Sequence, residues 1–490
     1  MTIFRSRYAD QPIPLVDIPT FIFSTARQTS SYRTRPSAKI FVDVSTGYGL
    51  TLDELETRCR QFASGLVRNL GFSNGDTLMF VSPNSIEYPV VVIGTMMAGG
   101  TCSLANPAYT PNELAYQMKD CGAKFLVATP DTVANVVAAA KQLGIPASRM
   151  VVVGGGNGSD NVKVEAAAKE HGARSIGSTL SSHLIEPVKV VGEAAKTRVA
   201  LLCYSSGTTG LSKGVMTTHY NMVSNIIQCT ALVELDPVPQ IVRQEEIVSL
   251  SVLPYYHIYG LHTQLLWSVT KAQTTVVMSK FDLVAFLEAI QRYRVTDGSL
   301  VPPIILALAK HPIVDKYDTS SFKFVMSGAA KLGPDLSEEF SKRLNLVVCQ
   351  GWGLTETSPV ATRNPNDGGI PGSVGILLPN VEMKVIDDEG KAVGVGQTGE
   401  LLVRGPNIMH GYHNNVKATE ECIDKERWFY TGDIGHIDEN GYVFITDRRK
   451  SLIKYKGFQV SPAELEGLLL THPLIADCAV IGVEDDAQAT

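Results

Sequence analysis

Apolar, strand-like segments alternate with helix-like segments along the first 200 residues, and no other feature restricts the fold as strongly. The segment TLDELETRCRQFASGLVRNL at 51–70 has helical spacing of Leu, Phe and Val, and the strand-like DTLMFVS follows at 76–82. The same order recurs at ELAYQMKDCG and KFLVAT, and VALLCYS at 199–205 is a further apolar strand. Strands that alternate with helices favour largely parallel sheets covered by helices.

The pattern changes after about Ser373. Short strand-like segments, VEMKVIDDEG, TGELLVRGP and GYVFITDRR, are separated there by Gly, Asn and Asp turns. Such spacing predicts a small, mostly antiparallel β subdomain. The chain stops at VIGVEDDAQAT, directly after a strand-like run, so we expect the last domain to be truncated.

Charge and cysteine spacing exclude several classes of function. The 490 residues carry 43 basic and 49 acidic side chains, a net charge of −6, which gives no electrostatic reason to expect nucleic acid as a partner. The 8 cysteines form no Cys-x-x-Cys pair, so we expect no thiolate metal site. No run of about 18 apolar residues is present, so we expect no transmembrane segment.

The segment YSSGTTGLSKGV, from Tyr204 to Val215, indicates a phosphate-binding loop directly after the strand VALLCYS. Glycines let backbone N–H groups point into one concavity, hydroxyls add donors, and Lys213 adds a positive charge. The alternative is a flexible linker, which would not need so apolar a strand before it. A P-loop is excluded because Gly214, and not Ser or Thr, follows Lys213.

SSGTTGLSKG resembles the phosphate loop of the acyl-adenylate-forming (ANL) superfamily, with Ser212 where that family usually has Pro. Further segments resemble the family in the family's own order, and the resemblance covers nearly the whole chain from about residue 40. They are LPYYHIYG (253–260), MSGAAKLG (326–333), QGWGLTET (350–357), GELLVRGPNIMHGY (399–412), WFYTGDIG (428–435) and DRRKSLIKYKGFQVSPAELE (447–466). The last segment is most similar to the branch of 4-coumarate–CoA ligase-like acyl-CoA synthetases.

The resemblance implies an α/β fold with a large N-terminal domain at 1–446. That domain would hold two helix-covered, mostly parallel sheets and the β subdomain at about 373–446. Residues 447–490 would begin a mobile α+β C-terminal domain that turns about a hinge near Asp447. In the family, a lysine further along that domain serves adenylation. We therefore expect this chain to adenylate poorly while its nucleotide pocket remains intact.

The implied reaction uses ATP, Mg²⁺ and coenzyme A. A carboxylic acid and ATP give acyl-AMP and pyrophosphate, and coenzyme A then gives acyl-CoA and AMP. Glu356 would hold the Mg²⁺, Thr355 would contact the α-phosphate, and Asp433 would accept hydrogen bonds from the ribose hydroxyls. The residues that match the family's ATP and AMP contacts are Ser205, Ser206, Gly207, Thr208, Thr209, Gly210, Lys213, Gln350, Gly351, Trp352, Thr355, Asp433, Arg448, Lys450 and Lys454.

Carried over in the same way, His257 would lie beside the reacting carboxyl, although a His between two tyrosines is also a common core residue. The residues implied in catalysis are His257, Lys213, Thr355, Glu356 and Lys454. The acyl pocket would be lined by His257, Tyr259, Thr263, Ala329 and Gly351, and coenzyme A would contact Lys280, Lys456 and Gly457.

The substrate acid is predicted only by class. The YYHIYG stretch is aromatic and neutral, and a buried ammonium would lack a partner there, which disfavours amino acids. Met326 precedes SGAAKLG where plant coumarate ligases commonly carry a lysine. We therefore expect an aryl-alkanoic or cinnamic-type acid, or a medium-chain fatty acid.

Other classes remain open on the sequence. A luciferase-like oxygenase shares these motifs, and a truncated chain is also compatible with a non-catalytic nucleotide or acyl binder. We expect a cytoplasmic or peroxisomal protein, and the sequence leaves monomer and homodimer equally open.

Overall fold

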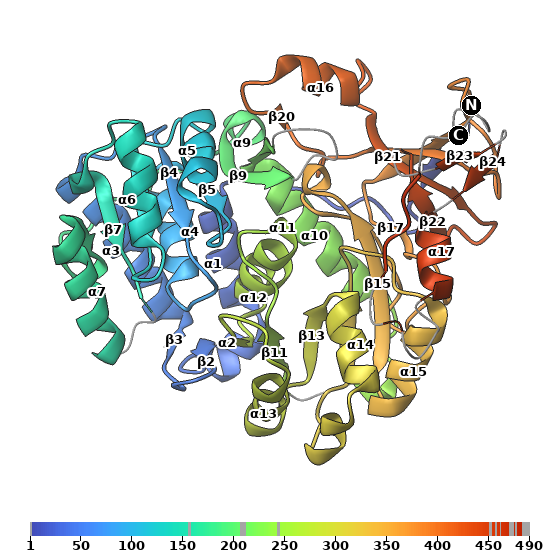
Figure 1. Ribbon diagram of the computed structural model, residues 1–490, viewed down its shortest axis with the longest axis horizontal. Helices are drawn as coiled ribbons and strands as arrows, with labels where there is room; N and C mark the ends of the chain where they lie inside the picture. Colours follow the sequence, from blue (N-terminus) through green and yellow to red (C-terminus); the bar gives the residue numbers. More distant parts are fainter. Residues whose placement is uncertain are drawn as a thin grey trace.

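The computed structural model describes residues 2–154, 158–205, 212–242 and 246–449, and beyond them 453–455, 458–460, 462–469, 475 and 478–482. Several predicted site residues lie outside the described residues: Ser206, Gly207, Thr208, Thr209, Gly210, Lys450, Lys456 and Gly457. Figure 1 shows large helix-covered sheets side by side, with a smaller β unit at the right of the view.

The first sheet contains the strands predicted in the N-terminal part. In spatial order its described strands are β20 (Gly411–Tyr412), β10 (Lys213–Thr218), β9 (Val199–Ser205), β5 (Thr101–Ala105), β4 (Thr77–Val81), β6 (Phe125–Ala128), β7 (Met150–Val152) and β8 (Arg174–Ser175). The strands from β9 to β8 are parallel, whereas β10 is antiparallel to β9 and β20 is antiparallel to β10.

Helices accompany this sheet, as the alternation predicts. They include α1 (Ile18–Gln28), α3 (Leu52–Leu70), α4 (Tyr88–Met97), α5 (Pro111–Asp120), α6 (Val133–Gln142), α7 (Gly158–His171), α8 (Ile176–Thr179) and α9 (Ala194–Thr197). The predicted helix at 51–70 is α3. Its N-cap Thr51 and Glu54 form a capping box, and Gly71 ends it with a positive φ of 76°.

The second sheet is built around a parallel centre. In spatial order its described strands are β17 (Ile376–Leu377), β16 (Val360–Arg363), β15 (Val347–Gly353), β14 (Phe324–Ser327), β13 (Asp297–Leu300), β11 (Val248–Ser251), β12 (Thr274–Val277), β2 (Lys39–Asp43) and β3 (Gly49–Thr51). The run from β15 to β2 is parallel, and the strands at either end are antiparallel to their neighbours.

The described helical segments of this region and of the connections follow. They are α2 (Ser30–Thr34), η1 (Ala147–Arg149), α10 (His219–Leu235), η2 (Gln240–Val242), α11 (Ile258–Gly260), the π-helix η3 (Leu261–Leu266), α12 (Trp267–Lys271), α13 (Leu283–Tyr293), α14 (Pro302–Lys310), η4 (Pro312–Lys316), α15 (Pro334–Leu344) and η5 (Thr355–Thr357). The α/β fold with helix-covered, mostly parallel sheets is therefore confirmed.

A small antiparallel sheet follows in the C-terminal part. Its described strands, in spatial order, are β1 (Phe4–Arg5), β18 (Glu382–Ile386), β19 (Gly399–Arg404), β21 (Phe429–Ile437) and β22 (Val443–Arg448). After β20 comes α16 (Val416–Cys422), and after β22 come β23 (Ile453–Tyr455), β24 (Phe458–Val460) and α17 (Pro462–Leu469).

The boundaries of this β unit differ in two respects from the expected span of 373–446. Its edge strand β1 comes from the N-terminus, while β17 and β20, inside that span, pair with the second and first sheets. Two-residue edge strands pair with whichever open edge lies nearest, and local sequence does not encode that choice. Because β20 pairs with β10, Gly411 and Tyr412 lie beside Met216 and Val215 of the first sheet.

The described helices do not include a membrane span. Each is too short or too polar to cross a lipid bilayer.

Candidate active site

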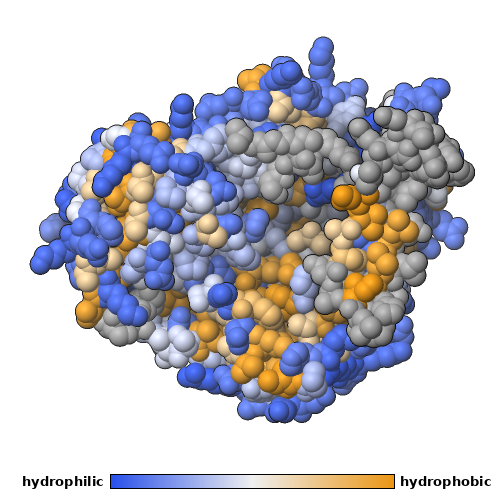
Figure 2. Space-filling view, viewed as in Figure 1, coloured by the Kyte–Doolittle hydropathy of each residue, from blue (hydrophilic) through white to orange (hydrophobic). Residues whose placement is uncertain are grey.

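A cavity of about 820 Å³ lies where the two large sheets and the small sheet meet. Figure 2 shows the surface hollowed near the centre of the same view. The wall is contributed by the ends of β9 and β10, the segment 253–260, the ends of β14 and β15, η5, α16 and β21. The carboxyl ends of several parallel strands thus open into one hollow, as is usual for ligand sites in α/β proteins.

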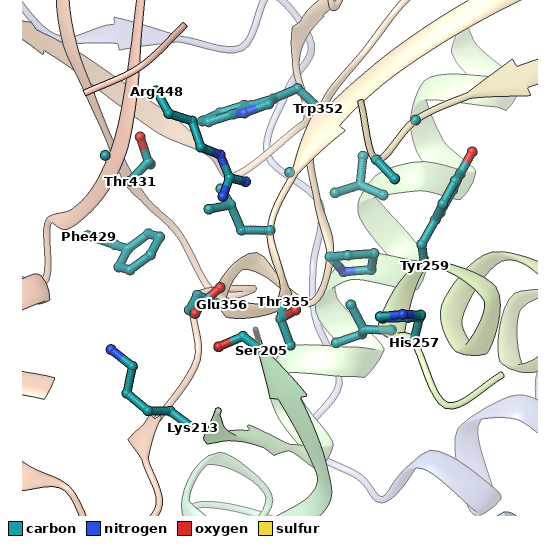
Figure 3. Close-up of a pocket in the computed structure, with 18 of the residues that line it drawn as sticks. Ser205, Lys213, His257, Tyr259, Trp352, Thr355, Glu356, Phe429, Thr431 and Arg448 are labelled. Carbon is teal, nitrogen blue, oxygen red and sulfur yellow. The ribbon is translucent and has the colours of Figure 1, made fainter. Parts of the chain in front are cut away.

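Ser205 and Lys213 form one end of the cavity. Ser205 is the last residue of β9 and Lys213 the first residue of β10, and the antiparallel register places them opposite each other. Both line the cavity (Figure 3). The two ends of the predicted phosphate loop are therefore held together by sheet pairing, with a hydroxyl and an ammonium facing the same space.

Glu356 is held beside this end by η5. The residue is 7% exposed, and its Oε1 accepts a hydrogen bond of 2.7 Å from the Tyr412 hydroxyl. Burial, and then the neighbouring Glu356 carboxylate, raise the pKa of Tyr412 far above its ordinary value, so the hydroxyl keeps its proton. Thr355 also lines the cavity beside Glu356 (Figure 3).

Asp433, Trp352 and Arg448 meet on another side of the cavity. The indole Nε1 of Trp352 donates to Asp433 Oδ2 at 2.8 Å, and Arg448 Nε lies 3.3 Å from Asp433 Oδ1. Asp433 is 3% exposed, and its burial raises the pKa of the carboxyl despite the opposing effects of Trp352 and Arg448. Trp352 and Arg448 line the cavity, whereas Asp433 does not line it and follows the lining residue Gly432 in β21.

Tyr259, Met326 and Gly351 form the predicted acyl end. The Tyr259 hydroxyl donates to the Met326 carbonyl at 3.0 Å, and all three residues line the cavity. A Cβ atom on Gly351 would lie 2.4 Å from Met326 Cε, so the glycine leaves room for this methionine. Ala329 also lines the cavity and has a positive φ of 70°, which is uncommon for a residue with a side chain.

His257 stands between the acyl end and the phosphate end. It precedes α11, and Figure 3 shows it below Tyr259, with Thr355 between it and Ser205 in the view. The ring is open to the cavity, yet the surrounding protein desolvates it and lowers its pKa below the ordinary value of 6.5. The imidazole is therefore neutral at pH 7. The structure places His257 in the cavity wall and not in the core.

Some predicted residues lie elsewhere. Thr263, in η3, turns its hydroxyl back to the Tyr259 carbonyl at 2.7 Å and does not line the cavity. Gln350 is buried behind the wall, where its Oε1 accepts from Leu332 N at 3.4 Å. Lys280 is exposed just after β12, away from the cavity wall. The backbone of Lys454 pairs with that of Gln459 in β23 and β24.

Several cavity residues were not predicted. Tyr412, Phe429 and Thr431 line it, and Figure 3 shows Phe429 and Thr431 above Glu356 in the view. Arg449 and Glu400 also line it and form an ion pair of 2.5 Å. Tyr412 and Phe429 lie inside the segments GELLVRGPNIMHGY and WFYTGDIG, but an aromatic residue beside a strand is equally typical of a core.

Comparison with known proteins identifies the family of this chain. Residues 28–413 match the family described as AMP-binding enzyme. The chain is 38% identical over 494 residues to 4-coumarate–CoA ligase 5 of Oryza sativa subsp. japonica, covering 99% of this chain and 86% of the relative.

Two solved structures extend the comparison. ATP-bound MatB from Rhodopseudomonas palustris matches with a TM-score of 0.80 and 30% identity, covering 96% of this chain and 86% of that one. The O-succinylbenzoate coenzyme A synthetase MenE from Bacillus subtilis, in complex with AMP, matches with a TM-score of 0.76 and 26% identity, covering 96% and 87%.

Proposed function

The chain belongs to the family of AMP-binding enzymes, in the acid–thiol ligase group that includes the 4-coumarate–CoA ligases, and we propose the reaction and the residue roles that follow. ATP is its nucleotide substrate. A carboxylate oxygen of the acid attacks the α-phosphorus of ATP, the bond to the β-phosphate breaks, and pyrophosphate leaves. The thiolate of coenzyme A then attacks the acyl carbonyl, and AMP leaves from the thioester product.

The observation that carries this proposal is the convergence of three chemically distinct ends on one cavity. Ser205 and Lys213 offer a hydroxyl and a cation to the phosphates, while Asp433 offers a buried acceptor for the ribose. The acid and the triphosphate are both anions, so their approach depends on such positioning and charge neutralisation. Lys213 offsets the charge of the departing pyrophosphate.

Glu356 fits a role in holding Mg²⁺. It is a buried carboxylate at the phosphate end, and only its Oε1 is engaged by Tyr412, so oxygen ligands remain for a hard cation. When bound, Mg²⁺ neutralises charge on the phosphate oxygens. The protein supplies the fixed position of the carboxylate.

His257 orients the acid at the junction of the two ends. Because its ring is neutral at pH 7, it can donate one hydrogen bond to the carboxylate without forming an ion pair. The acid thereby stays nucleophilic and faces the α-phosphate.

The acyl end supports an acid with an apolar body. Tyr259, Met326 and Val301 line it, and the described residues of that end include no Asp or Glu to pair with an ammonium. We therefore propose an aryl-alkanoic or cinnamic-type acid, or a medium-chain fatty acid. Coenzyme A contacts at Lys280, Lys456 and Gly457, and a cytoplasmic or peroxisomal location, remain part of the proposal.

Binding of stable adenylate analogues tests both the site and the acid. Thermal shifts are measured with cinnamoyl, phenylacetyl, hexanoyl and lauroyl sulfamoyl adenosines, with an aminoacyl analogue and with AMP. A ligand at about 100 times its dissociation constant stabilises by roughly 2.7 kcal/mol. We expect the analogues of one apolar acyl class to raise the melting temperature clearly more than AMP does. The same analogues should compete with AMP for binding.

A matched variant separates the two ends of the site. Val301→Phe narrows the acyl end, at a lining residue to which no nucleotide contact is assigned. We expect it to keep the AMP shift and to lose the additional shift of the acyl analogues. Equal shifts for every acyl group and for AMP would contradict the proposed acyl end, and no shift with AMP would contradict the nucleotide site.

A further inference from the structure

Tyr412 lies between the two opposite charges at the phosphate end. The Lys213 Nζ lies 4.4 Å from the centroid of the Tyr412 ring, and the Tyr412 hydroxyl donates to Glu356 Oε1 at 2.7 Å. The side chain is 7% exposed and lines the cavity. One aromatic residue therefore contacts both groups to which the proposed function assigns the phosphates and the Mg²⁺.

The backbone of Tyr412 is fixed by contacts with two elements. β20 pairs with β10, with Tyr412 opposite Val215, and His413 N donates to Gly214 O at 2.8 Å. Tyr412 N donates to Thr419 Oγ1 of α16 at 2.9 Å. The backbone at Tyr412 is thus held by both β10 and α16.

The two charges do not pair with each other. Among the described residues, the ion pairs of the structure do not include one between Lys213 and Glu356. Lys213 and Glu356 carry opposite charges and both contact Tyr412, and such charges attract each other strongly in a partly desolvated site. A direct pair would have to break before phosphate reached the ammonium or Mg²⁺ reached the carboxylate.

We propose that Tyr412 is a positioning residue that keeps Lys213 and Glu356 apart and available to the ligand, an inference that rests on the proposed function. The ring face attracts the ammonium without using its N–H donors, and the hydroxyl engages one carboxylate oxygen while the other stays open. Each charge thus has a partner that a phosphate or a cation can join without displacing it.

The neighbours on α16 do not take over this role. The Cys422 thiol lines the cavity, and its pKa is raised to about 11 by burial and by Glu356, so the thiol stays neutral and does not attract Lys213. Glu421 also lines the cavity and lies 3.9 Å from Lys417. Tyr412 is therefore the residue that separates the two charges.

Binding of pyrophosphate, measured by calorimetry with and without Mg²⁺, tests the role of the hydroxyl. Tyr412→Phe keeps the ring under Lys213 and loses the hydrogen bond to Glu356. We expect this variant to bind metal-free pyrophosphate with wild-type affinity. Its affinity for Mg²⁺–pyrophosphate should fall about tenfold, because the loss of one hydrogen bond to a charged group changes an affinity by about that factor. Wild-type affinity for Mg²⁺–pyrophosphate would overturn the inference.

A double variant tests the separation itself. In Tyr412→Leu the two charges can meet, so we expect metal-free pyrophosphate to bind about tenfold more weakly. Adding Glu356→Gln removes the competing carboxylate and should restore that affinity, which a merely structural defect would not allow. A double variant no better than Tyr412→Leu would overturn the inference.

The controls distinguish this inference from the proposed function. Tyr48→Leu removes the ring of another Lys–Tyr contact, 5.8 Å from Lys39 Nζ and away from the cavity, and should leave all binding unchanged. AMP carries neither β- nor γ-phosphate, so its thermal shift should be the same in every variant. If AMP does not bind the wild type, the proposed function fails and this inference with it. If AMP binds but the double variant shows no rescue, only this inference fails.

Discussion

Replacing Asp433 by Asn should weaken AMP binding without weakening the fold. Asp433 is 3% exposed, and its Oδ2 accepts from Trp352 Nε1 at 2.8 Å. In the variant the single amide oxygen stays with Trp352, and the amide NH₂ replaces Oδ1, the oxygen that the ribose would use, which lies 3.3 Å from Nε of the half-exposed Arg448. At least one hydrogen bond from the nucleoside to a charged acceptor is lost.

The magnitude follows from that count. A hydrogen bond to a charged group contributes about 1.5 to 3 kcal/mol, and each 1.4 kcal/mol is tenfold in affinity. The dissociation constant of AMP should therefore rise by about 10- to 150-fold. The melting temperature should stay unchanged or rise, because burial raises the pKa of Asp433, which means that its charge is unfavourable in the folded protein.

Calorimetric titration with AMP and a thermal melt without ligand measure the two quantities. Glu389→Gln, at an exposed carboxylate away from the cavity, is the matched control and should change neither. An AMP dissociation constant within threefold of the wild type would refute the reasoning about the ribose. A melting temperature that drops in parallel with affinity would refute the assignment of the effect to binding.

The remaining predictions concern other parts of the site. Burial lowers the pKa of His257 below its ordinary value of 6.5, so the acidic limb of the pH profile of acyl-CoA formation should have its midpoint below 6.5, and a midpoint above 6.5 would contradict the role of His257. AMP affinity should decline on acidification at a pH above 3.8, the ordinary value of Asp, because the pKa of Asp433 is raised and binding needs its carboxylate. Met326→Ala enlarges the acyl end, so acyl sulfamates one or two methylenes longer should bind the variant with an affinity about fourfold higher per added methylene. A thermal-shift or competition series with chains of increasing length measures this. Arg449→Ala removes an ion-pair partner from the buried Glu400 and should lower stability by about 1 kcal/mol in urea unfolding, with Glu400→Gln in the same background recovering it.

The predicted site residues that line the cavity share a property of their local sequence. Ser205 and Lys213 flank one loop between adjacent strands, so the antiparallel pairing that joins those strands also joins them. Gly351 and Trp352 lie among the last residues of β15, and Thr355 and Glu356 follow directly in η5. For such residues the linear order already limits the position in space, which is why motif resemblance places them near one cavity.

Other aspects of the site depend on contacts between distant segments. Tyr412 lies far from Lys213 in sequence and reaches it only because β20 adds to the edge of β10. Thr263 was expected in the acyl wall, but its position in η3 returns its hydroxyl to the Tyr259 carbonyl. The exposure of His257 to the cavity likewise depends on how α11 packs against the second sheet.

The sequence by itself determined the alternation of strands and helices and the order of the motifs, and it predicted the phosphate loop, because periodicity and turn chemistry are local properties. Tertiary structure alone decided that Tyr412 contacts both Lys213 and Glu356. Edge-strand pairing, burial and the desolvation that shifts pKa values arise from atoms far apart in the chain, and no local pattern specifies them.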